Sequence, residues 1–255
     1  MDTAEDIKAL VRTSYGSIAT ESSSCCAPTA PSCCGDSRQA GYSDAELASL
    51  PDGADLGLGC GNPQAIAGLQ PGETVVDLGS GAGIDCFLAA RQVGPSGRVI
   101  GVDMTHEMLK KARDNAVTVG ASNVEFRLGE LEHLPIADNT ADVIVSNCVV
   151  NLVPDKAQVF REAFRVLKRG GRLAISDVVN AVTLPAALAS DPALLCGCVS
   201  GAVPAGQIEA WLADVGFTDI AVTTQPRSRA LIATWAPGTG VEDYVVSATI
   251  EARKP

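Results

Sequence analysis

Hydrophobic and polar positions follow two alternating rhythms through the middle of the chain. Short apolar runs, the pattern of buried strands, occupy residues 73–79, 98–103, 123–129, 141–147 and 172–179. Apolar residues spaced for helices lie between them, at residues 80–94, 105–120 and 155–171. Strands that alternate with helices predict right-handed βαβ units and a mostly parallel sheet covered on both faces.

The rhythm differs towards the two ends of the chain. Residues 4–19 can form an amphipathic helix, with Ile7, Leu10 and Val11 on one face. Residues 20–41 are rich in Ser, Pro and Gly and predict a linker. Residues 184–217 predict broken helices, and 218–235 and 243–255 predict strands that complete the sheet.

The expected fold is therefore α/β, with a doubly wound, mostly parallel, seven-stranded sheet of Rossmann-like type. We expect three regions along the chain. Residues 1–42 form an N-terminal helix and Cys-rich linker, residues 43–180 form the ligand-binding domain, and residues 181–255 cover the substrate side and add the last strands.

A glycine-rich turn, in VVDLGSGAG at 75–83, follows the first predicted strand. A strand, a glycine turn and a helix in that order let a ligand approach the backbone at the helix N-terminus. Asp103 ends the second predicted strand, where an acid can bind ribose hydroxyls. The alternative is a tight turn without a ligand, but the paired acid favours a nucleoside.

The spacing of the glycines indicates which nucleoside. Gly79, Gly81 and Gly83 read G-x-G-x-G, whereas dinucleotide sites read G-x-G-x-x-G. The carboxylate of Asp77, at the loop entrance, would repel a pyrophosphate and attract a cation. S-adenosylmethionine carries ribose, an ammonium group and a sulfonium group but no phosphate, so it fits better than a nicotinamide dinucleotide.

The composition of the chain limits the kinds of partner that it can be expected to bind. The formal net charge is −11, from 19 Lys and Arg against 30 Asp and Glu, and only 4% of residues are aromatic. Such a surface repels phosphate backbones and anionic lipid, so we expect no nucleic-acid and no membrane partner. The acidic N-terminus lacks the pattern of a signal peptide, which leads us to expect a cytoplasmic protein.

Nine cysteines are many for a reducing compartment and indicate soft-ion binding or redox chemistry. Cys60, Cys148 and Cys198 fall in segments that can meet at the carboxyl ends of the strands, where such sheets bind ligands. Three thiolates suit a trivalent metalloid, and the CxxC or histidine spacing of zinc sites is not evident beside His106 and His133. Cys86 is more simply interpreted as core packing.

The motifs VVDLGSGAG, VIGVDMTHEML, LGELEHLP and DVIVSN resemble the class I S-adenosylmethionine-dependent methyltransferases over residues 62–180. The resemblance implies adenine contacts at Glu130 and Leu131, a ribose contact at Asp103, and methionine-tail contacts around Asp77 and Asn147. The full set of cofactor-binding residues expected is Asp77, Gly79, Ser80, Gly81, Gly83, Asp103, Met104, Glu130, Leu131 and Asn147.

The segments GCGNP, SNCVVNL and CVSGA, on this frame, resemble the arsenite methyltransferases. By that resemblance Cys60, Cys148 and Cys198 are the catalytic thiols that hold As(III), with Cys196 as the alternative third ligand. The linker pairs resemble the tails of bacterial members and are either accessory thiols or bystanders; they are Cys25, Cys26, Cys33 and Cys34.

The implied activity is methyl transfer from S-adenosylmethionine to thiolate-bound As(III), which detoxifies arsenic as methylated arsenicals. The expected partners are arsenite or its thiol conjugates, with thioredoxin or glutathione as reductant. One rival interpretation is a methyltransferase for a small organic acceptor such as a quinone carbon. Another is a non-catalytic metalloid-binding or redox protein.

Overall fold

A computed structural model describes residues 3–20 and 35–255 of the chain. The strands are β1 Thr74–Leu78, β2 Arg98–Asp103, β3 Val124–Leu128, β4 Ala141–Asn147, β5 Leu167–Asn180, β6 Val203–Pro204, β7 Thr218–Gln225 and β8 Val245–Arg253. The longer helices are α1 Ala4–Thr20, α4 Ile84–Val93, α5 His106–Val119, α6 Lys156–Val166 and α9 Ala205–Val215. The short ones are α2 Asp44–Leu47, α3 Gln64–Ala67, α7 Ala186–Ala189, α8 Pro192–Cys196 and α10 Arg229–Ile232, with 3₁₀ turns η1 Val150–Leu152, η2 Pro226–Ser228 and η3 Val241–Asp243.

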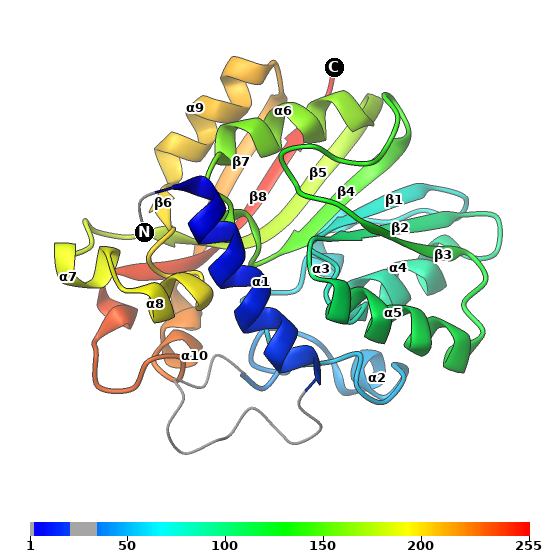
Figure 1. Ribbon diagram of the computed structural model, residues 1–255. Coiled ribbons are helices and arrows are strands. Elements are labelled where there is room, and N and C mark those ends of the chain that lie inside the picture. Colours follow the sequence, from blue (N-terminus) through cyan, green and yellow to red (C-terminus); the bar gives the residue numbers. More distant parts are fainter. Residues whose placement is uncertain (1–2, 21–34) are drawn as a thin grey trace.

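The strands form one sheet in the order β3-β2-β1-β4-β5-β8-β7, and β6 pairs with β5 off that path (Figure 1). β1 to β5 run parallel, while β8 is antiparallel to both β5 and β7. The winding reverses between β1 and β4, which are neighbours in the sheet. Ligands of open α/β sheets bind outside the carboxyl ends of the strands at such a reversal.

Alternate residues of the strands supply two separate apolar cores. Val76 and Leu78 of β1 face a core shared with α6 and α9. Val75 faces the opposite core, which α4 and α5 cover. Because side chains alternate across a strand, a sheet covered on both faces needs strands that are apolar throughout. The predicted α/β fold is confirmed.

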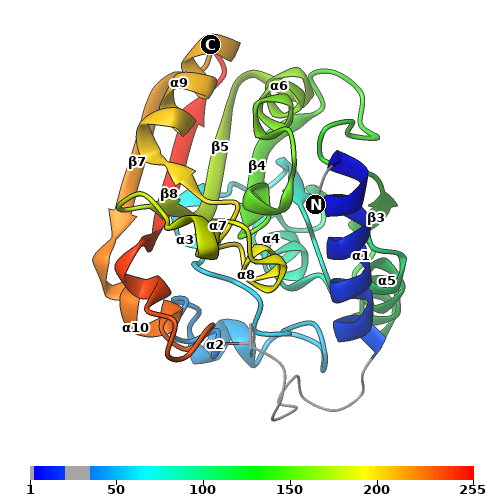
Figure 2. The same cartoon turned by 60° about the vertical axis from the view of Figure 1, so that its left-hand side comes forward.

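A third apolar cluster lies at the carboxyl edge and not on either face of the sheet. It joins Val11 of α1 to Leu194 of α8, Ile232 of α10 and the thiols of Cys60, Cys148 and Cys198. Figures 1 and 2 both show α1 passing across this edge beside α5. The N-terminal helix therefore covers the end of the sheet at which a ligand is expected.

Two predicted boundaries were wrong. The helix expected over 155–171 ends at Val166, because Leu167 turns to an extended conformation and pairs with Ala141 of β4. The strand expected over 218–235 stops at Gln225, since Pro226 has no N–H for the ladder and begins a 3₁₀ turn. The sheet also has one more strand than the seven expected, the two-residue β6.

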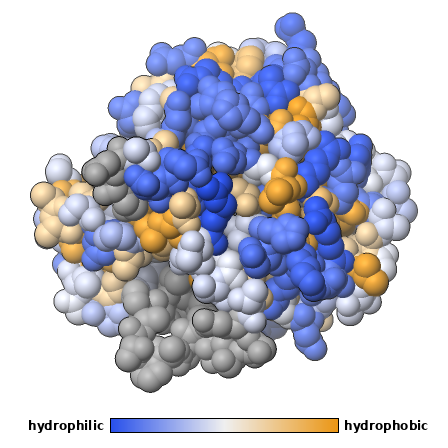
Figure 3. Space-filling model, in the orientation of Figure 1, coloured by the Kyte–Doolittle hydropathy of each residue, from blue (hydrophilic) through white to orange (hydrophobic). Residues whose placement is uncertain are grey.

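The surface of the described residues differs in hydropathy from one part to another of the face shown in Figure 3. Hydrophilic residues cover much of the face that carries α1, while hydrophobic residues gather over α7 and α8 (Figure 3). None of the helices in residues 3–20 and 35–255 is long and apolar enough to span a bilayer.

Candidate active site

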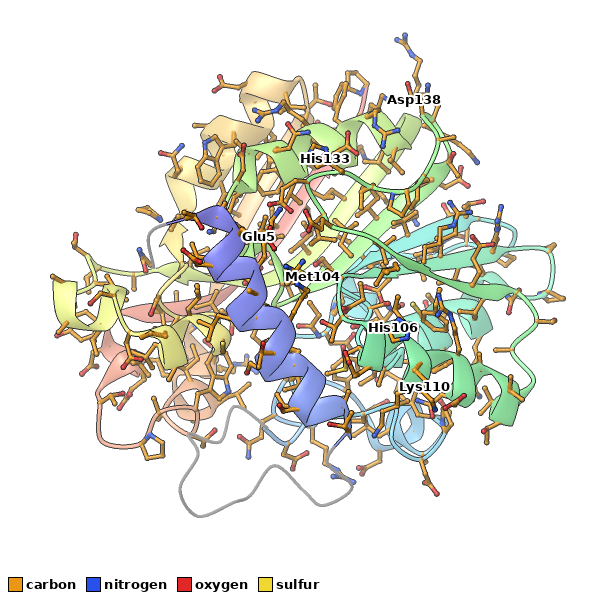
Figure 4. The ribbon with its side chains drawn as sticks, in the orientation of Figure 1. Glu5, Met104, His106, Lys110, His133 and Asp138 are labelled. Carbon is orange, nitrogen blue, oxygen red and sulfur yellow. The ribbon has the colours of Figure 1, made fainter. Side chains whose placement is uncertain are left out.

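A cavity with about 1040 Å³ of empty space, its open mouth included, lies at the carboxyl edge between β1, β2, β4 and α1. Many of the residues expected from the sequence line it: Asp77, Gly79, Ser80, Gly81, Asp103, Met104, Leu131, Asn147 and Cys148. Lys8, Val11 and Tyr15 of α1 form part of the wall. Met104 lies beside α1 near the centre of the view in Figure 4.

The glycine loop shapes the floor of this cavity. Gly79 and Gly81 have φ of 72° and 50°, a left-handed backbone that side chains rarely adopt. A Cβ at Gly79 would lie 2.4 Å from a methyl carbon of Val149, whereas one at Gly81 would meet no atom within 4 Å. Gly79 therefore permits close packing of two loops, and Gly81 faces open space.

Gly83 has a different position from the other two glycines. It caps the start of α4 with φ of 101°, and a Cβ there would lie 2.7 Å from the ring of Phe87. The cavity lining among the described residues does not include it. Its lack of a side chain lets α4 pack against the sheet.

Two acids lie at the glycine loop: Asp77 is buried, and Asp103 is half-buried and accepts a hydrogen bond from the loop. The Gly81 N–H donates to Asp103 Oδ2 at 2.9 Å, and the Thr105 N–H donates to Asp103 Oδ1 at 2.8 Å. Burial raises the pKa of Asp103 from its usual value. Burial, followed by the nearby Asp85 carboxylate, raises the pKa of Asp77 well above its usual value. The Cys86 thiol donates to Asp77 Oδ2 at 3.2 Å, so Cys86 adds a polar contact to its packing role.

Asn147 links the cavity to the first cysteine. Its Oδ1 accepts the Cys60 N–H at 3.1 Å, and its Nδ2 donates to Gly61 O at 2.8 Å and Tyr42 Oη at 2.9 Å. Tyr42 in turn donates to Asp85 Oδ1 at 2.9 Å. Burial raises the pKa of Asp85 to about 6. Sequence reasoning missed Tyr42 and Asp85, whose polar side chains are buried at predicted loop and helix positions.

The three expected cysteines lie together under α1. Cys60 is 3% exposed, Cys148 4% and Cys198 2%. The Cys60 and Cys148 sulfurs and a carboxylate oxygen of Asp177 all lie within 4.8 Å of one another. Cys198 Sγ approaches from another side of Cys148 and donates to its carbonyl at 2.7 Å. Among these cysteines, Cys148 also lines the cavity, so the cluster opens onto it.

The backbone at two of these cysteines is strained. Cys148 has φ of 59° and Cys198 has φ of 61°. A left-handed conformation costs a residue with a side chain roughly 1–2 kcal/mol, and such strain gathers at functional sites. Asp177 supports the Cys148 turn by accepting the Val150 N–H at 2.9 Å and the Asn151 side-chain amide at 2.9 Å.

The surroundings of two of these thiols, Cys60 and Cys148, favour their protonated forms. Burial raises the pKa of Cys60. Hydrogen bonds with Cys198 and Cys60, followed by burial, raise the pKa of Cys148 well above its usual value. Burial also raises the pKa of Asp177 to about 6, which leaves it mostly ionised at neutral pH.

Cys196 stands apart from this cluster. Its thiol pairs with Ser14 of α1, and its carbonyl accepts the Tyr15 hydroxyl at 3.0 Å. It does not belong to the apolar cluster that holds the other three thiols. The linker cysteines 25, 26, 33 and 34 lie outside the described residues.

Glu130, the acid expected at the adenine position, is not among the described residues that line the cavity. Glu130 accepts from Lys8 Nζ at 2.6 Å and pairs with Arg12 at 3.4 Å, so its charge is neutralised by α1. Leu131 and Glu132 line the cavity in that region, and Glu132 also pairs with Lys8 at 3.1 Å. The sequence could not show this, because the partners of Glu130 come from the far end of the chain.

Both histidines are exposed and lie on separate segments (Figure 4). His106 begins α5 and His133 lies in the loop after β3. Neither lines the cavity among the described residues, so the site contains no histidine base.

These features define an S-adenosylmethionine-dependent methyltransferase of class I. A family model described as "Methyltransferase domain" matches residues 69–224. The chain is 50% identical to the arsenite methyltransferase of Halobacterium salinarum over 263 residues. The alignment covers 98% of this chain and 67% of that protein. It is 41% identical over 152 residues to the arsenite methyltransferase of Homo sapiens, which covers 56% of this chain and 40% of that protein.

A solved structure extends the likeness. The arsenic(III) S-adenosylmethionine methyltransferase from Chlamydomonas reinhardtii matches with a TM-score of 0.64 and 33% identity, over 86% of this chain and 72% of that one. The chain spans about two thirds of the Halobacterium relative and less than half of the human one. The chain belongs to the arsenite methyltransferase family.

Proposed function

We propose that the protein transfers the methyl group of S-adenosylmethionine to As(III) bound by Cys60, Cys148 and Cys198. The observation that carries the proposal is the meeting of three buried thiols from distant segments beside the cavity, with Cys148 belonging to both. The strained backbone of Cys148 and Cys198 supports it, because strain persists where function requires it.

The charge of the site matches a trivalent metalloid. Arsenous acid is neutral, and each thiol can give its proton to one arsenic hydroxyl, which leaves as water. Three As–S bonds then form with no net charge left in a buried pocket, where a charge would be costly. The raised pKa values of Cys60 and Cys148 present thiols that are neutral before the exchange.

The residues of the cavity fit the cofactor. Gly81 leaves open space over the loop, and Asp103 at the end of β2 keeps lone pairs for ribose hydroxyls. Asp77 and Asn147 line the same cavity as Cys148 and suit the amino-acid end. When bound, S-adenosylmethionine supplies an electrophilic methyl group whose sulfur leaves as a neutral thioether.

This chain then acts by positioning rather than by proton transfer. The lone pair of As(III) is a nucleophile that needs no base, in agreement with the histidine-free site. The protein holds arsenic and methyl carbon in line at about 3–3.5 Å and keeps water out, which α1 does by covering the cavity.

Several finer points belong to the same proposal. Residues 43–180 bind the cofactor and 181–255 cover the metalloid, as the expected regions require. The arsenic is oxidised as its lone pair becomes a bond, so thioredoxin or glutathione supplies the electrons that return it to the trivalent state. We place this activity in the cytoplasm, acting on arsenite or its thiol conjugates, without a nucleic-acid or membrane partner.

The test is mass spectrometry of arsenic products after incubation with arsenite, S-adenosylmethionine and glutathione. Methylated arsenic is expected with the native chain and with Cys196→Ser, the matched control for a buried cysteine outside the cluster. Cys148→Ser should abolish it. If only inorganic arsenic remains with the native chain, or if it methylates a quinone instead, the proposal fails.

A further inference from the structure

The thiol cluster contains a fourth donor that an As(III) site does not need. Asp177, near the end of β5, is 1% exposed, and one of its carboxylate oxygens lies within 4.8 Å of the Cys60 and Cys148 sulfurs. Its hydrogen bonds come from Val150, Asn151 and Val178. Two of these bonds go to Oδ1 and one to Oδ2, so Oδ2 keeps a lone pair that can bind a cation.

The carboxylate adds a hard, negative oxygen to two soft sulfurs. As(III) with three thiolates is already neutral and three-coordinate, so an extra anion gives it nothing. A divalent cation differs, because it needs more negative charge and usually four donors, and mixed thiolate and carboxylate sets suit zinc. Lys156 lies near enough to Asp177 and Cys198 to interact electrostatically and offsets the remaining negative charge.

We propose that Cys60, Cys148 and Asp177 form a binding site for a thiophilic divalent cation of the Zn²⁺ class, in competition with arsenite. The competition rests on the proposed function, because two of the three ligands are shared with As(III). The two thiols release their protons to solvent when the cation binds, and a water completes the fourth position.

The distances permit this coordination. Zinc–sulfur bonds of about 2.3 Å and zinc–oxygen bonds of about 2.0–2.2 Å place tetrahedral donors about 3.6–3.8 Å apart. The three donor atoms already lie within 4.8 Å, so side-chain rotations of about an ångström bring them to ligand distance.

The experiment separates the two ligand sets. The full chain carries Cys25→Ser, Cys26→Ser, Cys33→Ser and Cys34→Ser throughout, so that the linker thiols do not bind the probe. Zn²⁺ binding is measured by equilibrium dialysis without arsenite or cofactor, and arsenite binding is measured the same way. For Asp177→Asn, Zn²⁺ affinity should fall at least about tenfold more than arsenite affinity.

Cys198→Ser should lower the arsenite affinity more than the Zn²⁺ affinity, because Cys198 belongs to the proposed arsenic ligands but not to the three proposed cation ligands. Cys196→Ser is the matched control and should change neither affinity. The inference would be overturned if Cys198→Ser lost both affinities equally. It would also be overturned if the chain that carries only the four linker substitutions bound no Zn²⁺. If Asp177→Asn fails to fold, the Cys198→Ser comparison still decides.

The turnover assay distinguishes this inference from the proposed function. Zn²⁺ should raise the KM for arsenite and leave kcat unchanged. Methylated arsenic without any Zn²⁺ binding would refute the cation site alone. Zn²⁺ binding without any methylated arsenic would refute the proposed function.

Discussion

The left-handed backbone at Cys148 makes a prediction that reverses the usual order of stability of two substitutions. Cys148→Ala and Cys148→Gly both remove the thiol and its packing. They differ in one methyl group and in the freedom of the backbone at φ of 59°. We expect the glycine variant to be the more stable of the two.

The magnitude follows from the conformation. A left-handed residue with a Cβ costs roughly 1–2 kcal/mol that glycine avoids, offset in part by the greater freedom of glycine in the unfolded chain. The net advantage of Cys148→Gly over Cys148→Ala is about 1 kcal/mol. For a chain of this size that is a melting temperature about 2–4 °C higher.

Cys86 provides the matched control. It is fully buried like Cys148, but it lies within the helix α4. There glycine costs about 1 kcal/mol relative to alanine, so Cys86→Gly should be less stable than Cys86→Ala. Chemical denaturation of the four variants measures both differences. The same sign at both positions would refute the argument that strain is stored at Cys148.

Three further predictions concern the cap, the cofactor and pH. Lys8→Ala, which breaks the pairs of α1 with Glu130 and Glu132, should raise the KM for S-adenosylmethionine about two- to fivefold at low salt and less at high salt, measured by initial rates. Asp103→Ala should raise that KM at least about tenfold while arsenite binding, measured by dialysis, changes little. The pKa of Asp85 is about 6 in the folded chain and about 4 when unfolded, so the folded chain binds this proton more tightly. Proton binding therefore stabilises the fold below about pH 4, and this contribution is lost as the pH rises through about 6. As the pH rises from about 4 to about 6, the unfolding free energy of Asp85→Asn should therefore increase relative to that of the native chain. A difference between the two free energies that does not change with pH would refute this.

Much of the fold could be predicted because the apolar pattern was locally unambiguous. β1 and β2 were expected because their runs are apolar on both faces, as a covered parallel strand requires. The end of α6 was not, since Leu167 suits a helix by its spacing and is drawn into β5 by pairing with Ala141. Boundaries set by strand pairing depend on partners that a local pattern does not contain.

The candidate site shows the same division. Cys148 was expected at the carboxyl edge from its position after β4, whereas the choice of Cys60 and Cys198 as its partners came from the resemblance to the arsenite methyltransferases. Asp177 was missed, because an acid near the end of an apolar strand gives no signal until the loop of Cys148 packs on it. Glu130 shows the converse, as its pairing with α1 joins residues that are far apart in sequence.

The account's central claim, that three specific thiols hold arsenic, is tested most directly by arsenic K-edge X-ray absorption of the As(III)-loaded full chain, with the four linker cysteines replaced by serine. The native cluster should give three sulfur neighbours. Cys60→Ser, Cys148→Ser and Cys198→Ser should each replace one sulfur with oxygen, and Cys196→Ser should leave all three. Three sulfurs that persist in Cys198→Ser, or the loss of a sulfur in Cys196→Ser, would show that Cys60, Cys148 and Cys198 are not the arsenic ligands.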